Sequence, residues 1–328
     1  MLLKIDLDNK VMKFIKISAL GFVAVTIFAS CGNGSQRLDV CQLGDDVVRV
    51  APGSDAAEAK PRVVLPLESV APDSSKLSYT VAADGAVTIS NGRTTFTDSG
   101  LRRRTADGRT VIEIVTDSRA PLYGAGERGH SIDLRGDTLV MYNRQNYGYT
   151  GSDPRISQMN ITMPLLVSAD GFAIVFDDFA PAELIAGDTI RYISENPEPV
   201  SYYVVGTGES PAETIEQLSR LTGRQDLPPF WSLGYITSKY GYRTQAQTIG
   251  TIDTLKRRNY PVDGIVLDLY WYGKEQDMGR LAWEPEQWPD PEGMLAGLRD
   301  KGVNLTAISQ PYVLRNGRAI DNYNELAP

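Results

Sequence analysis

Short runs of alternating or β-branched apolar residues follow one another from about residue 47 to residue 205. Four turn dipeptides lie between such runs: Asp84-Gly85, Asn91-Gly92, Asp107-Gly108 and Asp170-Gly171. Each predicts a β-hairpin, with a type I′ turn that needs positive φ angles. The strands expected around them are Leu77–Val81, Ala86–Ile89, Val111–Val115, Ile161–Val167, Phe172–Phe176 and Tyr202–Val205. No stretch before residue 211 predicts a helix, so we expect an antiparallel β-sandwich.

The period of the apolar residues changes after Gly208. Ser210-Pro211-Ala212-Glu213 is a typical helix start, and Leu227-Pro228-Pro229-Phe230 indicates a break between domains. Beyond the break, strands are expected at 231–237, 262–271 and 304–313, with helices at 244–259 and 291–301. Strands that alternate with helices predict a parallel α/β arrangement. A doubly wound sheet and a (β/α)8 barrel both begin in this way, and the pattern does not separate them.

One glycine pattern suggests a nucleotide site. Residues 124–129, Gly-Ala-Gly-Glu-Arg-Gly, match G-x-G-x-x-G, which binds dinucleotides when a strand precedes it, a helix follows it and an acidic residue lies about 20 positions on. Here Pro121 interrupts the approach, residues 130–143 show no helical period, and position 146 is Asn. We therefore reject a nucleotide site and expect a sandwich loop whose glycines serve tight turns.

Composition excludes several classes of function. The net charge of −8 argues against nucleic-acid binding, which needs a basic face. The chain has one histidine, His130, and two cysteines, too few for a usual zinc site. A Ser-His-Asp triad could only use His130, which has no nucleophile elbow nearby. Asp177 and Asp178 are adjacent, and neighbouring side chains on a strand point in opposite directions, so we expect no metal site there. Any chemistry should rest on carboxylates, or on residues outside this chain, and we expect no cofactor.

The N-terminus predicts export. Lys13 and Lys16 precede an uncharged apolar run, Ile17–Ser30, which ends at Cys31. This arrangement is typical of a secretory signal, and the run is shorter than the roughly 20 residues of a membrane-spanning helix. Cys31 resembles the lipidated cysteine of bacterial lipoproteins. We expect a signal over residues 1–31, with Met12 as a possible start, then a tether over 32–46 and a protein facing the periplasm or the cell surface of a Gram-negative-type bacterium. The lipid would be its only contact with a membrane.

Four strings occur in order in the second half: LPPFWSLGYITSKYGYR (227–243), PVDGIVLDLYWYG (261–273), WEPEQWPDPEGM (283–294) and GVNLTAISQPYV (302–313). Together they resemble the opening of the catalytic barrel in glycoside hydrolase family 31, the retaining α-glucosidases and α-transglucosylases. LYGAGE and MPLLVSADGFAIVFDD resemble that family's N-terminal β-sandwich. The resemblance implies a sandwich over residues 47–225, followed by about three β/α units of a (β/α)8 barrel over 226–328. Many members have a second Asp at the position of Tyr270. The tyrosine found here instead resembles the oligosaccharide 4-α-glucosyltransferase branch.

The resemblance implies a retaining mechanism on α-linked gluco-oligosaccharides, in which one carboxylate attacks and another acts as acid and base. In the family the nucleophile lies near the end of the fourth barrel strand, in a string like W-x-D-M-N-E. We expect both catalytic carboxylates beyond Pro328 and no glycosidase activity from residues 1–328 alone. Two alternatives stay open: an α-xylosidase of the same family, and a non-catalytic carbohydrate-binding lipoprotein.

The resemblance also names residues that would bind sugar. Asp268, at the end of the second barrel strand, would hydrogen-bond sugar hydroxyls in the −1 subsite. Tyr270 and Trp271 follow it and would either stack on a sugar or pack in the core. A loop over residues 143–153 would reach the substrate pocket through Asn146, Tyr147 and Tyr149. The family assigns no catalytic role to Glu284 or Glu286.

Overall fold

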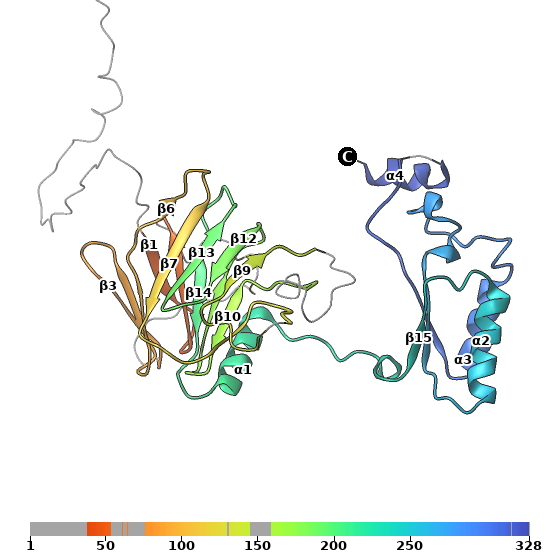
Figure 1. Cartoon of the computed structure of the whole chain (residues 1–328), viewed down its shortest axis with the longest axis horizontal. Helices are drawn as coiled ribbons and strands as arrows, with labels where there is room; N and C mark the ends of the chain where they lie inside the picture. The colour runs from red at the N-terminus through yellow and green to blue at the C-terminus, as the bar shows by residue number, and fades with distance from the viewer. Residues whose placement is uncertain are drawn as a thin grey trace, which may run out of the picture. The chain divides into compact units, whose positions relative to one another are not determined.

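The computed structural model describes residues 38–53, 61, 64, 76–129, 131–144, 159–315 and 317–327. The chain divides into two units, residues 1–224 and residues 225–328 (Figure 1). The expected signal, with Met12 and Cys31, lies outside the described residues, as does His130. Within the described part of the chain, no helix is long and apolar enough to cross a membrane.

Two antiparallel sheets make up the N-terminal unit. The six-stranded sheet has the order β1-β2-β14-β11-β10-β8: Leu38–Gln42, Val47–Pro52, Tyr202–Val205, Phe172–Phe176, Leu165–Ser168 and Leu122–Gly124. The second sheet has the order β3-β4-β5-β7-β13-β12-β9: Ser78–Val81, Val87–Ser90, Thr95–Asp98, Thr110–Thr116, Thr189–Ser194, Ala182–Ile185 and Thr138–Met141. The short β6, Arg103–Arg104, pairs with β7. All six strands predicted in this region overlap an observed strand.

The two sheets share one core. Burial alternates along β7 and β4, so each presents every second side chain to the interior. Phe96 of β5 meets Phe172 of β11 edge to face at 4.5 Å between ring centroids, and Phe176 stacks on Tyr192 of β13 at 4.2 Å. These ring pairs join the six-stranded sheet to the other sheet across the core.

Strand β11 is buried on both faces because a helix covers the outside of its sheet. The helix α1, Pro211–Thr222, places Leu218 and Leu221 in a second apolar cluster with Ala173 and Val175 of β11. The predicted helix start is confirmed, since the Ser210 side chain accepts the backbone N–H of Glu213.

All four Asx-Gly pairs lie between the ends of neighbouring strands, but the prediction of type I′ turns was wrong. Asp84 does not have the positive φ angle that a type I′ turn needs, whereas Gly85 does, at 90°. The Ala82 N–H binds the Ala86 carbonyl at 2.8 Å, which leaves a three-residue loop closed by a left-handed glycine. Gly92 is the first central residue of its turn, and of the two central residues it alone has a positive φ angle, as in a type II′ turn.

The G-x-G-x-x-G stretch lies in a strand and a loop. Strand β8 ends at Gly124, and β8 pairs antiparallel with β10. A Cβ added to Gly126 would lie 2.3 Å from the carbonyl oxygen of Ile161, so only glycine fits this close approach of two backbones. No helix lies in the described residues 131–144, so the stretch lacks the helix that a dinucleotide-binding turn needs. The strand predicted at 161–167 begins only at Leu165, after Pro164, which has no N–H for a ladder.

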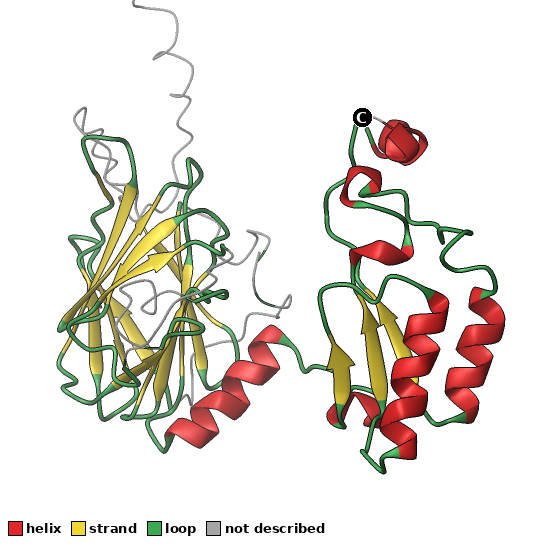
Figure 2. Ribbon diagram, turned by 45° about the vertical axis from the view of Figure 1, so that its right-hand side comes forward, coloured by secondary structure: helices red, strands yellow, loops and turns green. Residues whose placement is uncertain are grey.

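The C-terminal unit is parallel α/β, as predicted. Its sheet has the order β15-β16-β17, Ile236–Ser238, Gly264–Leu267 and Asn304–Ala307, and both pairings are parallel. Two helices, α2 (Gln245–Arg257) and α3 (Pro291–Asp300), cover one face of the sheet (Figure 2). The short α4, Ile320–Leu326, follows β17.

The three observed strands in this unit are shorter than predicted. Residues Phe230–Leu233 form a 3₁₀ turn, η2, and Leu269–Trp271 form another, η3, so neither segment belongs to a strand. Strand β17 ends at Ala307, where its last pairing partner is Leu267. After β16 the apolar run continues because Leu269, Trp271 and Tyr272 of the following loop also pack into the core.

Candidate functional site

The carboxyl ends of β15, β16 and β17 lie at one edge of the parallel sheet. Ligand sites of open α/β sheets and barrels are built at this edge. The segments that follow β15 and β16 there, residues 239–243 and 268–275, contain the sequence-predicted Asp268, Tyr270 and Trp271. The structure brings these three residues together within one turn after β16.

Asp268 is the first residue after β16 and the N-cap of the turn η3. Its Oδ1 accepts the backbone N–H of Leu269 at 2.8 Å, which fixes the carboxylate at the strand end. The residue is half-buried, and its Oδ2 accepts no hydrogen bond from any residue that the structure describes. This carboxylate is therefore held in place with one oxygen available to a ligand hydroxyl.

Tyr270 is held by residues from the β15 loop. The guanidinium carbon of Arg243 lies 4.2 Å from the centre of the Tyr270 ring, and Arg243 Nη2 donates to the Tyr270 hydroxyl at 3.2 Å. The ring of Tyr240 meets the same ring edge to face at 5.7 Å. A stacked cation on one side and an edge-on ring on another restrict the Tyr270 side chain to one orientation.

The Tyr240 hydroxyl in turn donates to the Glu275 carboxylate, and this hydrogen bond raises the pKa of Tyr240 above its usual value. Arg243, Tyr240 and Glu275 thus form a connected set that links two loops beside Asp268. Sequence reasoning left out Arg243 and Glu275, although Arg243 ends the quoted string KYGYR. Their pairing depends on which loops meet at the sheet edge, and that is known only once the strand order is known.

Trp271 packs in the core of the C-terminal unit. It is 9% exposed, and its indole N–H donates to the Ile308 carbonyl at 2.8 Å. Its ring meets Tyr272 at 5.4 Å and Trp283 at 5.3 Å, both edge to face. Of the two alternatives for Trp271, this packing favours the core over a sugar-stacking wall. Trp288 is fully buried, and its indole N–H donates a hydrogen bond to the Tyr270 carbonyl at 3.1 Å, which holds the turn η3 in place.

Glu284 lies between two arginines and forms ion pairs with both. Its carboxylate accepts Arg280 at 2.8 Å and is also paired with Arg318, whose hydrogen bond lowers the pKa of Glu284. Arg318 comes from η5, Gly317–Ala319, so the ion pairs tie that segment to the loop after β16. A carboxylate held between two guanidiniums is a poor proton donor.

Asp177 and Asp178 of the N-terminal unit are both buried, and both accept hydrogen bonds from neighbouring hydroxyls. The described residues contain no group of three or more side chains arranged to hold a metal ion. The loop residues Asn146, Tyr147 and Tyr149 lie outside the described residues, so their expected contacts with sugar stay predictions.

Comparison with known proteins gives a consistent family. Residues 225–327 match the profile of the glycosyl hydrolases family 31 TIM-barrel domain. The chain is 29% identical over 198 residues to alpha-xylosidase XylQ of Lactiplantibacillus pentosus, which covers 58% of this chain and 25% of that protein. It is 26% identical over 221 residues to an alpha-glucosidase of Saccharolobus solfataricus, which covers 65% of this chain and 31% of that protein. The chain thus spans about a quarter to a third of the length of these relatives.

Solved structures share the fold. A GH31 alpha-xylosidase from a soil metagenome, complexed with xylose, superposes with a TM-score of 0.69 at 18% identity, over 90% of this chain and 48% of that chain. The GH31 dextranase of Flavobacterium johnsoniae, complexed with glucose, gives a TM-score of 0.68 at 18% identity, over 86% and 37% of the two chains.

These four matched proteins are glycosidases, enzymes that hydrolyse O-glycosyl compounds. The profile match over residues 225–327 and these relatives agree on glycoside hydrolase family 31 as the family that this chain resembles.

Proposed function

We propose that this chain is part of a retaining glycosidase that acts on α-linked gluco-oligosaccharides, by hydrolysis or by transfer to a second sugar. In this proposal the N-terminal unit is a β-sandwich, and the C-terminal unit contributes about three β/α units to a (β/α)8 barrel. The observation that carries it is Asp268, a fixed carboxylate with an available oxygen at the carboxyl end of β16.

The role proposed for Asp268 is to bind sugar hydroxyls in the −1 subsite. A carboxylate accepts hydrogen bonds from hydroxyl groups, and such charge-assisted bonds orient the ring for attack at the anomeric carbon. Tyr270, held by Arg243 and Tyr240, would form a wall of the same pocket. A retaining reaction also needs a nucleophilic carboxylate and an acid/base carboxylate, and we assign neither to a residue of this chain.

An α-xylosidase is the second candidate within the family. It is supported by the relatives of that name from Lactiplantibacillus pentosus and Emericella nidulans, at 29% and 28% identity. The two activities differ in whether the pocket accepts the C6 hydroxymethyl group, which glucose has and xylose lacks. The substrate panel below therefore includes both sugars.

The proposal is tested with the complete coding frame to which residues 1–328 belong, assayed on aryl α-glucoside and aryl α-xyloside. We expect turnover of the glucoside to exceed that of the xyloside, and the reverse order would favour the α-xylosidase. A polypeptide of residues 1–328 is the matched background. Its parallel sheet has three strands in the described part, whereas a closed barrel has eight, so we expect no turnover from it. Release of aryl alcohol by that polypeptide would contradict the assignment of the reacting carboxylates.

We also propose that the protein is exported and carries a lipid on Cys31, on the strength of the basic and apolar residues before it. In cells fed a radiolabelled fatty acid, the wild-type protein should take up label and sediment with membranes. The Cys31→Ser variant should do neither, and a Cys41→Ser variant is the matched control because it keeps the signal intact. Equal labelling of wild type and Cys31→Ser would rule out lipidation at this residue.

A further inference from the structure

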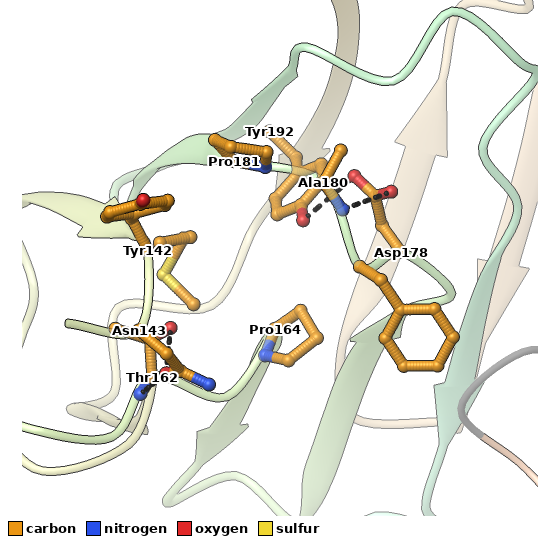
Figure 3. Close-up of a pocket in the computed structure, with 10 residues that line it drawn as sticks. Tyr142, Asn143, Thr162, Pro164, Asp178, Ala180, Pro181 and Tyr192 are labelled. Atoms are coloured by element: carbon orange, nitrogen blue, oxygen red, sulfur yellow. Dashed lines mark hydrogen bonds between the residues drawn. The ribbon is translucent and has the colours of Figure 1, made fainter. Parts of the chain in front are cut away.

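Two cavities adjoin on the N-terminal unit, where β9 forms the edge of its sheet. The first has a volume of about 290 Å³ and the second about 370 Å³, and Tyr142 and Pro181 line both. In Figure 3 Tyr142 and Asn143 lie on one side of the first cavity and Asp178 on the other, with Pro164 between them. We call the two cavities the Tyr142 groove, and the side chains that matter in it are Arg109, Tyr142, Asn143, Phe179, Glu183 and Glu195.

Two aromatic rings stand at this groove with much of their surface exposed. Tyr142 is 52% exposed and Phe179 is 75% exposed. Aromatic faces bind the apolar C–H faces of sugar rings, and binding sites commonly combine such rings with a few polar groups. The volumes are at the lower end of the roughly 300–1,000 Å³ usual for ligand sites, so each cavity suits one small ring.

The wall that carries Phe179 is rigid because of the residue before it. Asp178 is 3% exposed. Its carboxylate accepts four hydrogen bonds, from the Ala180 N–H (3.1 Å), Asn196 Nδ2 (2.8 Å), the Tyr192 hydroxyl (3.2 Å) and the Ser194 hydroxyl. Asp178 is thus fully occupied within the protein and fixes the backbone of the turn that carries Phe179 through the Ala180 N–H.

Polar groups with spare hydrogen-bonding capacity complete the groove. The Asn143 Oδ1 accepts both the N–H and the hydroxyl of Thr162, at 2.6 and 2.9 Å, which leaves its Nδ2 without a partner among the described residues. Glu183 and Glu195 make no side-chain hydrogen bond to the described part of the chain, whereas Arg109 Nε is paired with Asp107 at 2.9 Å. The groove thus has two negative carboxylates and one guanidinium, which is already paired with Asp107. This balance of charge disfavours an anionic ligand.

We propose that the Tyr142 groove binds a short neutral oligosaccharide, with sugar rings on Tyr142 and Phe179 and hydroxyls on Asn143, Glu183 and Glu195. Neutral hydroxyls suit both an amide donor and carboxylate acceptors, and the two exposed rings suit the C–H faces of pyranoses. Asn143 also begins the loop 143–153 that is expected at the substrate pocket, whereas both rings and both glutamates lie outside that loop. The proposal therefore concerns binding that requires no bond to be cleaved.

The test is isothermal titration of the whole 328-residue chain with maltotriose, in a detergent without a sugar headgroup. We expect measurable binding to wild type, and at least about tenfold weaker binding to Tyr142→Ala and to Phe179→Ala. Tyr260→Ala is the matched control, because Tyr260 is 58% exposed and lies in the C-terminal unit. Trigalacturonate, an anionic trisaccharide, should bind at least about tenfold more weakly than maltotriose.

The Asp268→Asn variant separates this proposal from the proposed glycosidase. All four tryptophans, at positions 231, 271, 283 and 288, lie in the C-terminal unit, so their fluorescence reports a sugar bound beside Asp268. Groove binding should persist in Asp268→Asn. Loss of binding in Asp268→Asn with full binding in Tyr142→Ala would overturn the groove and leave the glycosidase standing. No binding of maltotriose by wild type, or tighter binding of trigalacturonate, would also overturn it.

Discussion

Replacement of Asp268 by asparagine in the complete protein is expected to lower kcat/KM for its α-glycoside by about 100-fold or more. The available Oδ2 of Asp268 would accept hydroxyl hydrogen bonds of the bound sugar, and hydrogen bonds to a charged group contribute about 1.5–3 kcal/mol each. Asparagine retains an Oδ1 that accepts the Leu269 N–H, so the turn η3 should keep its cap. The loss should therefore be one of substrate binding and orientation, with the fold intact.

The matched control for this variant is Asp300→Asn. Asp300 ends α3, is exposed, and makes no side-chain hydrogen bond to a described residue. It should leave kcat/KM unchanged. Thermal melting followed by tryptophan fluorescence checks that both variants keep a folded C-terminal unit. If Asp268→Asn retained wild-type kcat/KM while folded, the proposed role of Asp268 would be wrong.

The largest expected loss of stability comes from Asp98 in the N-terminal unit. Its side chain is 1% exposed and pairs with Arg102, 6% exposed, through two hydrogen bonds of 3.0 and 2.9 Å. Asp98 also accepts the Tyr202 hydroxyl at 3.0 Å and the Gly100 N–H at 2.9 Å. Burial raises the pKa of Tyr202, which therefore stays a donor at neutral pH. Asp98→Ala would leave the buried Arg102 cation unpaired and should cost about 3–5 kcal/mol.

Circular dichroism and tryptophan fluorescence together test this loss. Because the N-terminal unit has no tryptophan, its unfolding should appear in the far-ultraviolet circular dichroism, while fluorescence follows the C-terminal unit. Asp98→Ala should lower the urea midpoint seen by circular dichroism and leave the midpoint seen by fluorescence unchanged. Glu113→Ala, which removes a half-exposed cross-strand partner of Arg191, should cost less than about 1 kcal/mol. If Asp98→Ala and Glu113→Ala lowered the free energy of unfolding equally, the buried Asp98–Arg102 pair would not have the stabilising role given to it here.

Much of the fold follows from local signals in the sequence. The glycines of the four Asx-Gly pairs mark turns because glycine adopts positive φ without a steric cost, and Met294 and Leu298 mark the buried face of α3. The turn type did not follow, because it depends on the number of residues between paired strands. The strand ends did not follow either, since apolar residues such as Trp271 continue into loops that are also buried.

The candidate site was predictable only in part. Asp268 could be found because it directly follows an apolar strand within a family string. Arg243 and Glu275 could not, since their link through Tyr240 and Tyr270 requires that two loops meet at one sheet edge. The Tyr142 groove has the same origin: Glu183 comes to lie beside Val140 only through the pairing of β9 with β12.

The most direct measurement is the anomeric form of the first sugar that the complete protein releases. Proton NMR, recorded within the first turnovers of an aryl α-glucoside, distinguishes the two anomers before they interconvert. A retaining reaction proceeds through two displacements at the anomeric carbon and releases the α anomer first. Appearance of the β anomer first, or no release of aryl alcohol from either the α-glucoside or the α-xyloside, would contradict the assignment to a retaining α-glycosidase.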